Sequence, residues 1–163
     1  MSPEPYLSAP TAIQIHAAAA FVALVLGPWV IYRPRRDRLH KTTGYVWIAG
    51  MAVAAMSSFA IHSFPLIGPF SPIHLLACLA LWSIYRGIAA AVQGDIRTHR
   101  EVFRSLYWYG LVIAGLVNFL PGRTTNRTFF GEDDHLGWVV IGLGGTLLVA
   151  DFLRRRGRTT RIA

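Results

Sequence analysis

Five runs of apolar residues, separated by short polar segments, dominate the chain. They cover residues 12–32, 43–64, 72–93, 104–121 and 136–153. Each run has roughly 18–22 residues, the length that an α-helix needs to cross about 30 Å of hydrocarbon. A helix of a soluble bundle would show a polar stripe every three or four residues, and these runs do not. The pattern predicts an all-α integral membrane protein with five transmembrane helices.

Basic residues are distributed unevenly between the two ends of the predicted helices. The chain has 16 Lys and Arg residues against 8 Asp and Glu residues, for a formal net charge of +8. All the basic residues except Arg123 and Arg127 fall on one side, which the positive-inside rule assigns to the cytoplasm. The N-terminus is therefore expected outside and the C-terminus inside. This placement indicates contact with a lipid bilayer rather than with nucleic acid.

Two segments, 12–64 and 70–121, repeat one arrangement: a helical hairpin with a histidine at the start of each helix. These histidines are His16 and His40 in the first segment and His74 and His99 in the second. Each segment contains two spans, so both have the same orientation, and such parallel repeats are related by an axis along the membrane normal. The repeat predicts that the first four helices form a four-helix bundle of two parallel hairpin repeats. The helix 136–153 is then an addition to a single membrane domain, 1–163.

The repeat also predicts how the histidines pair. Equivalent helices face each other diagonally across a four-helix bundle, so equivalent histidines can point at its axis from opposite sides. His16 and His74 form an outer pair, and His40 and His99 form an inner pair. Two imidazoles that approach one point from opposite directions are a bis-axial ligand set for haem. We therefore predict two b-type haems per chain, one near each membrane face.

A simpler interpretation of each histidine is open. A single histidine near a membrane interface is often only an amphipathic side chain at headgroup depth. However, helix N-termini carry partial positive charge, so a protonated histidine gains nothing there. Capping boxes that begin at Thr11 and Thr98 are expected to supply the helix caps, so the histidines have no capping role. His135 opens the fifth run, and its role is left open.

Other polar residues are candidates for supporting roles. Arg38 and Arg97 each stand two residues before an inner histidine, so they are candidates for contacts with haem propionates or other anions. Positive-inside topology also explains both arginines. Arg123 is a candidate for an outer propionate or an anionic substrate, with interfacial anchoring as its alternative. His62 is a candidate for proton handling or quinone binding on the outer side.

Several short motifs carry a family resemblance. These motifs are QIHAAAA, RLHKTTGYVWIAGM, SSFAIHSF, FSPIHLL, THREVFRSLYWYGLVIAG and LPGR. In this order they resemble an uncharacterised bacterial multi-pass membrane family, domain of unknown function 2306. The resemblance covers roughly residues 12–125 and leaves the fifth run outside. It implies a protein of the bacterial inner (cytoplasmic) membrane and no established activity.

The four histidines also resemble, by position alone, the ligands of the cytochrome b561 type of di-haem membrane protein. That resemblance implies a transmembrane oxidoreductase that transfers electrons across the membrane between two b-type haems. Its donor and acceptor are left open, and a quinone or another small redox partner is a candidate. It is an analogy of architecture. The competing hypothesis is a haem-free membrane protein: a small transporter, a metal-handling protein or an assembly factor that uses the interfacial histidines.

Overall fold

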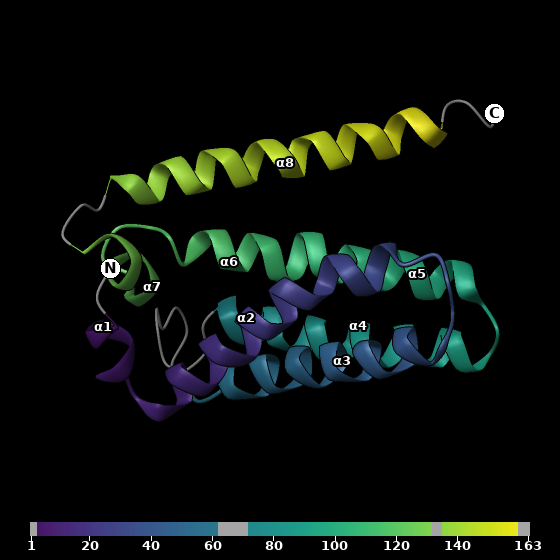
Figure 1. Cartoon of the computed structure of the whole chain (residues 1–163), viewed down its shortest axis with the longest axis horizontal. Coiled ribbons are helices and arrows are strands. Elements are labelled where there is room, and N and C mark those ends of the chain that lie inside the picture. Colours follow the sequence, from purple (N-terminus) through teal and green to yellow (C-terminus); the bar gives the residue numbers. More distant parts are fainter. Residues whose placement is uncertain (1–2, 62–71, 132–134, 160–163) are drawn as a thin grey trace. The chain divides into compact units, whose positions relative to one another are not determined.

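All the regular secondary structure in the part of the chain that the structure describes is helical (Figure 1). This computed structural model describes residues 3–61, 72–131 and 135–159. The chain divides into two compact units. One is Ala9–Leu111, and the other consists of Met1–Ser8 together with Val112–Ala163. The boundary falls inside a continuous helical stretch, and each unit is described by itself.

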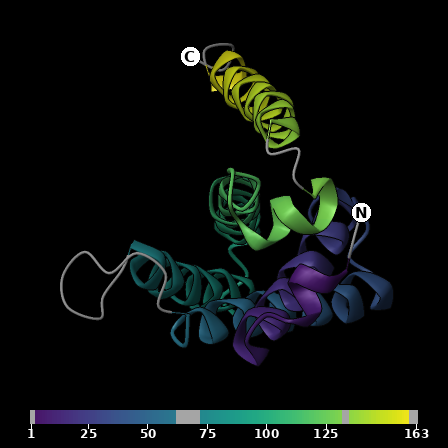
Figure 2. The same ribbon diagram turned by 90° about the vertical axis from the view of Figure 1, so that its left-hand side faces the viewer.

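The Ala9–Leu111 unit contains the helices that carry the four repeated histidines. They are α2 (Thr11–Tyr32), α3 (Arg38–Ser58), α4 (Pro72–Val92) and α5 (Ile96–Ser105). Helices that follow one another in the chain pack side by side: α2 on α3, α3 on α4, and α4 on α5. Helix α5 also contacts α2. Figure 2 shows α3 between α2 and α4, the neighbour order expected when connections between antiparallel helices are short.

Aspartates cap α3 and α5, and in α5 the aspartate takes the place of the expected capping box. A side-chain oxygen of Asp37 accepts a hydrogen bond from the backbone N–H of His40 at 2.9 Å. Asp95 accepts one from the backbone N–H of Thr98 at 3.0 Å. Pro10 precedes α2 without a side-chain cap, so Thr11 is the first helical residue. The expectation of capping boxes at Thr11 and Thr98 is wrong, because in α5 an aspartate three residues earlier already occupies the capping position.

Three helices among the described residues are long and apolar enough to cross a membrane. They are Thr11–Tyr32, His74–Val92 and Leu136–Arg154, which correspond to the first, third and fifth apolar runs. The second run coincides with α3, which ends at Ser58 rather than near residue 64. The hydroxyl of Ser58 donates to the carbonyl of Ala55 at 2.7 Å, a local bond that competes with continued helix.

The fourth apolar run is a helix interrupted by a π-helical segment. After α5 come the π-helix η1 (Leu106–Val112) and the α-helix α6 (Ile113–Val117). A π-turn holds more residues than an α-turn, so the residues after η1 face a different direction from those of an uninterrupted α-helix. The helix ends at Asn118, whose side-chain amide donates to the carbonyl of Ala114 at 3.1 Å.

The second unit packs α6 and three further helices against one another. Its other elements are α1 (Glu4–Leu7), α7 (Thr124–Phe130) and α8 (Leu136–Thr159). Helix α1 packs on α7, while α6 and α7 contact α8. Asn126 is fully buried and donates to the carbonyl of Phe119 at 2.6 Å. Gly137 packs directly on both residues, so a larger side chain would collide there.

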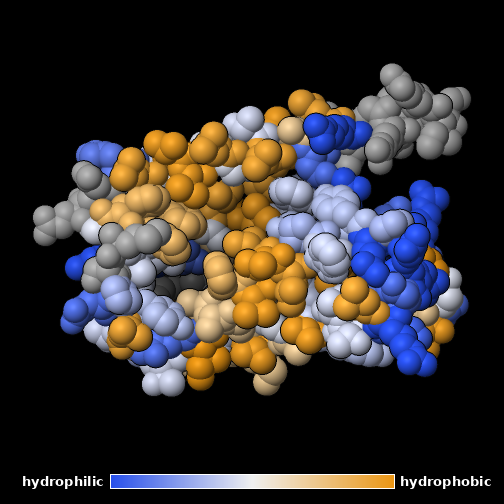
Figure 3. Space-filling model, viewed as in Figure 1, coloured by the Kyte–Doolittle hydropathy of each residue, from blue (hydrophilic) through white to orange (hydrophobic). Residues whose placement is uncertain are grey.

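The surface divides into apolar and basic regions. Large apolar side chains such as Phe21, Leu79 and Leu143 are more than half exposed. Such an apolar surface fits contact with lipid. Figure 3 shows hydrophilic residues gathered at the end where α2 connects to α3 and α4 connects to α5. The basic loops of the sequence therefore share one end of the Ala9–Leu111 unit.

Candidate functional site

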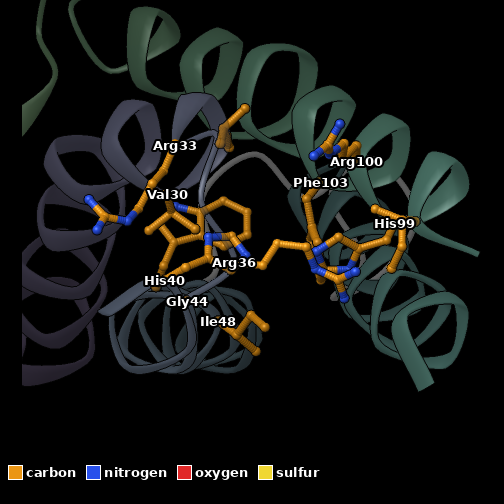
Figure 4. Close-up of a pocket in the computed structure, with 12 residues that line it drawn as sticks. Val30, Arg33, Arg36, His40, Gly44, Ile48, His99, Arg100 and Phe103 are labelled. Carbon is orange, nitrogen blue, oxygen red and sulfur yellow. The ribbon is translucent and has the colours of Figure 1, made fainter. Parts of the chain in front are cut away.

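The two histidines of the expected inner pair line one pocket (Figure 4). The pocket lies in the Ala9–Leu111 unit, among α2, α3, α5 and the segment between α2 and α3. Its empty space amounts to about 610 Å³, including the part that is open to solvent. His40 comes from α3 and His99 from α5, helices that do not follow each other in the chain. The fold thus brings together residues that are far apart in the sequence.

Two aromatic rings form the inner wall of the pocket. Trp47 and Phe103 meet edge to face, with ring centroids 5.5 Å apart. Trp47 is 1% exposed, and its indole N–H donates to the carbonyl of Ala23 at 2.9 Å. Phe103 in turn meets the ring of His99 at 4.9 Å, again edge to face. The hydrogen bond and the interlocked rings hold this apolar wall in a fixed position.

A backbone carbonyl orients the imidazole of His99. Its Nδ1 atom lies 3.0 Å from the carbonyl oxygen of Gly87 in α4. A carbonyl only accepts hydrogen bonds, so Nδ1 carries the proton. In the neutral ring the lone pair is then on Nε2. This arrangement, in which one ring nitrogen donates to a carbonyl, is usual for histidines that bind metals through the other nitrogen.

His40 is in an environment that favours its neutral form. Burial lowers the pKa of His40, and electrostatic interactions with His99 and Arg36 lower it further, whereas Asp37 opposes the shift. Its Nδ1 atom is buried and has no hydrogen-bond partner among the described residues. A neutral imidazole with an unused ring nitrogen can accept a proton or bind a metal.

Three arginines border the pocket: Arg33, Arg36 and Arg100. Arg33 is paired with Asp37, with Nη2 and Oδ2 2.5 Å apart, and this pairing lowers the pKa of the Asp37 carboxyl to about 2. Arg36 and Arg100 are exposed. None of the described residues that line the pocket is acidic. The border of the pocket is therefore electropositive.

The arginines expected to hold propionates lie outside this pocket lining. Arg38 is exposed at the first position of α3. Arg97 is also exposed, and its Nε pairs with Oε1 of Glu101 at 3.0 Å. Both stand two residues before a histidine, but helix geometry turns residues i and i+2 toward different sides. The structure therefore brings Arg36 and Arg100 to the histidines in place of Arg38 and Arg97.

The expected outer histidines contact the last part of α3 and the residue directly after it. Nδ1 of His16 lies 2.8 Å from the carbonyl oxygen of Ala54 and 3.3 Å from the hydroxyl of Ser57. The carbonyl again places the proton on Nδ1. His74 is buried, and its ring stacks on Phe59 with centroids 5.7 Å apart. The start of α2 and the start of α4 thus approach the same end of α3.

The other candidates lie elsewhere. His62 is outside the described residues. His135 is exposed immediately before α8, and its carbonyl accepts from the N–H of Trp138 at 3.1 Å. Arg123 is partly buried and precedes α7 in the second unit.

No group of three or more His, Cys, Asp or Glu side chains within the described residues is arranged to hold a metal ion. A haem differs from such a site because only two protein ligands are required.

Sequence reasoning missed the aromatic wall and two arginines. Trp47 follows His40 by seven residues and Phe103 follows His99 by four, so each shares a helix face with its histidine. That spacing is the signal that could have identified them. Arg36 and Arg100 carry no such signal, because basic residues are frequent in both connections.

Together, the helices and their apolar surface define a helical integral membrane protein. A family model described as "Predicted membrane protein (DUF2306)" matches residues 13–153, and the chain belongs to this family. The match includes α8 up to Leu153, so the expectation that the fifth run lies outside the family is wrong. The quoted motifs end before this run, which is apolar but has no short motif of its own. No curated protein and no solved structure matches the chain.

Proposed function

We propose that the protein is a b-type membrane cytochrome that transfers single electrons across the bacterial cytoplasmic membrane. The observation that carries this proposal is the pocket shared by His40 and His99. The residues present suit a haem: two imidazoles from different helices, an apolar aromatic wall and basic side chains at the border. When bound, the haem would supply one-electron redox chemistry. Its partner would be a quinol or another small reductant or oxidant.

The chain's own residues have distinct tasks in this proposal. His40 and His99 would hold the iron, and the hydrogen bond from His99 to Gly87 sets which ring nitrogen of His99 is available. Trp47 and Phe103 exclude water from the inner side of the pocket, which lowers the local dielectric and tunes the redox potential. Gly44 lines the pocket without a side chain, which leaves room for a flat group.

A second haem between His16 and His74 completes the proposed electron path. The support is the repeat, together with the contacts of His16 with Ala54 in the last part of α3 and of His74 with Phe59 directly after α3. The neighbour order of α2 to α5 supports a bundle in which α2 and α4 lie on one diagonal and α3 and α5 on the other. One haem would then lie near each end of this bundle.

The proposed topology has five spans, with the N-terminus outside and the C-terminus in the cytoplasm. The location of the basic loops at one end of the Ala9–Leu111 unit supports it. Fusions to alkaline phosphatase and to a fluorescent protein, placed after residues 35, 67, 95, 128 and 163, test this arrangement. Alternating reporter activity at successive positions is expected. Equal activity at two successive positions would contradict the intervening span.

Absorption spectroscopy tests the cytochrome itself. Protein expressed with ample haem and purified in detergent should show a Soret band and, after reduction, sharp α and β bands. His40→Ala and His99→Ala should each remove the inner haem. His135→Ala is the matched control, since His135 is exposed ahead of α8, and it should leave the spectrum unchanged. Well-folded but colourless wild-type protein would exclude the cytochrome and favour the haem-free transporter or metal-handling alternative.

A further inference from the structure

We propose that Arg36 and Arg100 form a subsite for two carboxylates. In this proposal the two arginines hold the propionates of the haem at the border of the pocket. This inference rests on the proposed function, because it assigns the part of the pocket that receives the anionic edge of the ligand. It assigns this task to residues other than Arg38 and Arg97, which were the candidates from the sequence.

Among the three arginines that line the pocket, Arg36 and Arg100 differ from Arg33 in their ion pairing. Arg33 already shares its charge with Asp37 through two hydrogen bonds, at 3.2 Å from Nε and 2.5 Å from Nη2. Arg36 and Arg100 remain as the pocket-lining guanidiniums for which the structure gives no carboxylate partner among the described residues. An anionic ligand would therefore find two guanidiniums whose charge is not already paired.

The position of these arginines matches an asymmetric ligand. Arg36 comes from the connection between α2 and α3, and Arg100 comes from the first half of α5. Trp47 and Phe103 close the pocket on its inner side, and both are buried. The pocket is thus apolar inside and positive at its exposed border. A molecule that fills it needs an apolar body with anionic groups on one edge, which describes a haem with its two propionates.

Guanidinium groups are suited to this role. An arginine can bind a carboxylate through two parallel hydrogen bonds, which adds orientation to charge attraction. Two such contacts would fix which edge of the haem faces the basic surface. The arginines are therefore positioning residues in this proposal, whereas the histidines bind the iron.

A comparison of two haem compounds tests the subsite. Wild-type protein stripped of haem is titrated in detergent with ferric protoporphyrin IX and with its dimethyl ester, which has no carboxylates. The Soret band reports binding. Each hydrogen-bonded charge pair contributes roughly tenfold in affinity, so wild-type protein should bind the acid at least tenfold more tightly than the ester. Equal affinity for the two compounds would overturn the inference.

Two double variants test whether Arg36 and Arg100 cause the preference for the acid over the ester. In the double variant Arg36→Gln and Arg100→Gln, affinity for the acid should fall at least tenfold while affinity for the ester stays the same. The matched control, Arg38→Gln and Arg97→Gln, removes the same formal charge from neighbouring positions and should change the acid affinity less than twofold. An equal loss in both variants would show a general charge effect and overturn the subsite.

The outcomes also separate this inference from the proposed function. Wild-type protein that binds neither compound contradicts the cytochrome proposal. Binding of both compounds with the same affinity leaves the cytochrome intact and removes only the subsite. Circular dichroism and gel filtration show whether the glutamine variants fold. If they do not, the comparison of acid and ester in the wild-type protein decides the matter, because it needs no substitution.

Discussion

Nδ1 of His99 lies 3.0 Å from the carbonyl oxygen of Gly87, one helix earlier in the chain. The same glycine supports the aromatic wall, because the ring of Phe103 packs directly against it. A Cβ atom added to Gly87 would lie 2.6–2.9 Å from three ring carbons of Phe103. One residue of α4 therefore determines both the orientation of a candidate ligand and the position of the ring beside it.

Replacing Gly87 should disturb the pocket. In Gly87→Ala the new methyl group must displace the Phe103 ring, so the free energy of unfolding should fall by about 1–3 kcal/mol. Haem affinity should fall as well, because His99 contacts the displaced ring. Denaturation in detergent and Soret titration measure the two effects. Gly115→Ala is the control: Gly115 has open space around it, and alanine there should stabilise the helix by about 0.5–1 kcal/mol. Equal changes of unfolding free energy and haem affinity in Gly87→Ala and Gly115→Ala would contradict this interpretation.

Trp47 is expected to be the most sensitive tryptophan. In Trp47→Ala a cavity replaces a buried indole, which should cost about 3–5 kcal/mol of unfolding free energy. Trp47→Phe keeps much of the volume but loses the hydrogen bond to Ala23, so a smaller loss of about 0.5–1.5 kcal/mol is expected. Trp82 is 57% exposed and serves as the control. Chemical unfolding should show a much larger loss of unfolding free energy in Trp47→Ala than in Trp47→Phe or Trp82→Ala. A larger loss in Trp82→Ala than in Trp47→Ala would contradict the prediction.

Asp37 should make stability depend on pH in the acid range. Its pKa is lowered from 3.8 to about 2, chiefly by the hydrogen bond from Arg33. An acidic group whose pKa is lowered by folding stabilises the folded state at pH values above its pKa in the unfolded chain. This contribution disappears as the pH falls from 3.8 toward 2. The melting temperature of wild-type protein should therefore exceed that of Asp37→Asn at pH 6, and the difference should vanish near pH 2.

The substitution and its control separate charge from capping. Asparagine also caps helices, so Asp37→Asn removes the charge while a side-chain acceptor stays available for the N–H of His40. Glu101→Gln removes the carboxylate of an exposed pair with Arg97, and such pairs contribute little. Thermal unfolding followed by circular dichroism at several pH values gives the comparison. A difference that persists unchanged at pH 2 would show that the Asp37 carboxylate is not responsible.

The outer histidines should be required for one of the two proposed haems. His16→Ala removes one proposed ligand of the outer haem and leaves the pocket around His40 and His99 intact. The ratio of haem to protein should therefore fall from two to one, as measured by the pyridine haemochrome assay together with amino-acid analysis. His135→Ala should keep the wild-type ratio. A ratio of one in the wild-type protein, unchanged in His16→Ala, would exclude the outer haem.

Much of the architecture follows from local sequence. Whether a segment can cross a membrane depends on its length and composition, so the helices Thr11–Tyr32, His74–Val92 and Leu136–Arg154 coincide with apolar runs. The repeat of histidines at helix starts is likewise visible without a structure, and so is the gathering of basic residues in two connections. These properties belong to continuous segments, and the free energy of placing a segment in lipid is nearly additive along it.

The candidate site depends on how the helices pack. In the sequence, Trp47 is one of several aromatic residues within the apolar runs, and only the contact with Phe103 assigns it to the wall of a pocket. Arg36 and Arg97 look alike in the sequence, but one lines the pocket and the other pairs with Glu101 on the surface. The rotation of each helix about its axis decides such differences, and it is set by contacts with neighbouring helices rather than by the helix's own residues.

The sequence alone thus determined that this is a helical membrane protein, and it indicated which histidines are equivalent. The tertiary structure decided which side chains surround them. The physical reason is the range of the interactions involved. Burial of apolar residues in lipid is a property of each helix, whereas the bond from His99 to Gly87 joins two helices. The contact of Trp47 with Phe103 likewise exists only when both helices are in place.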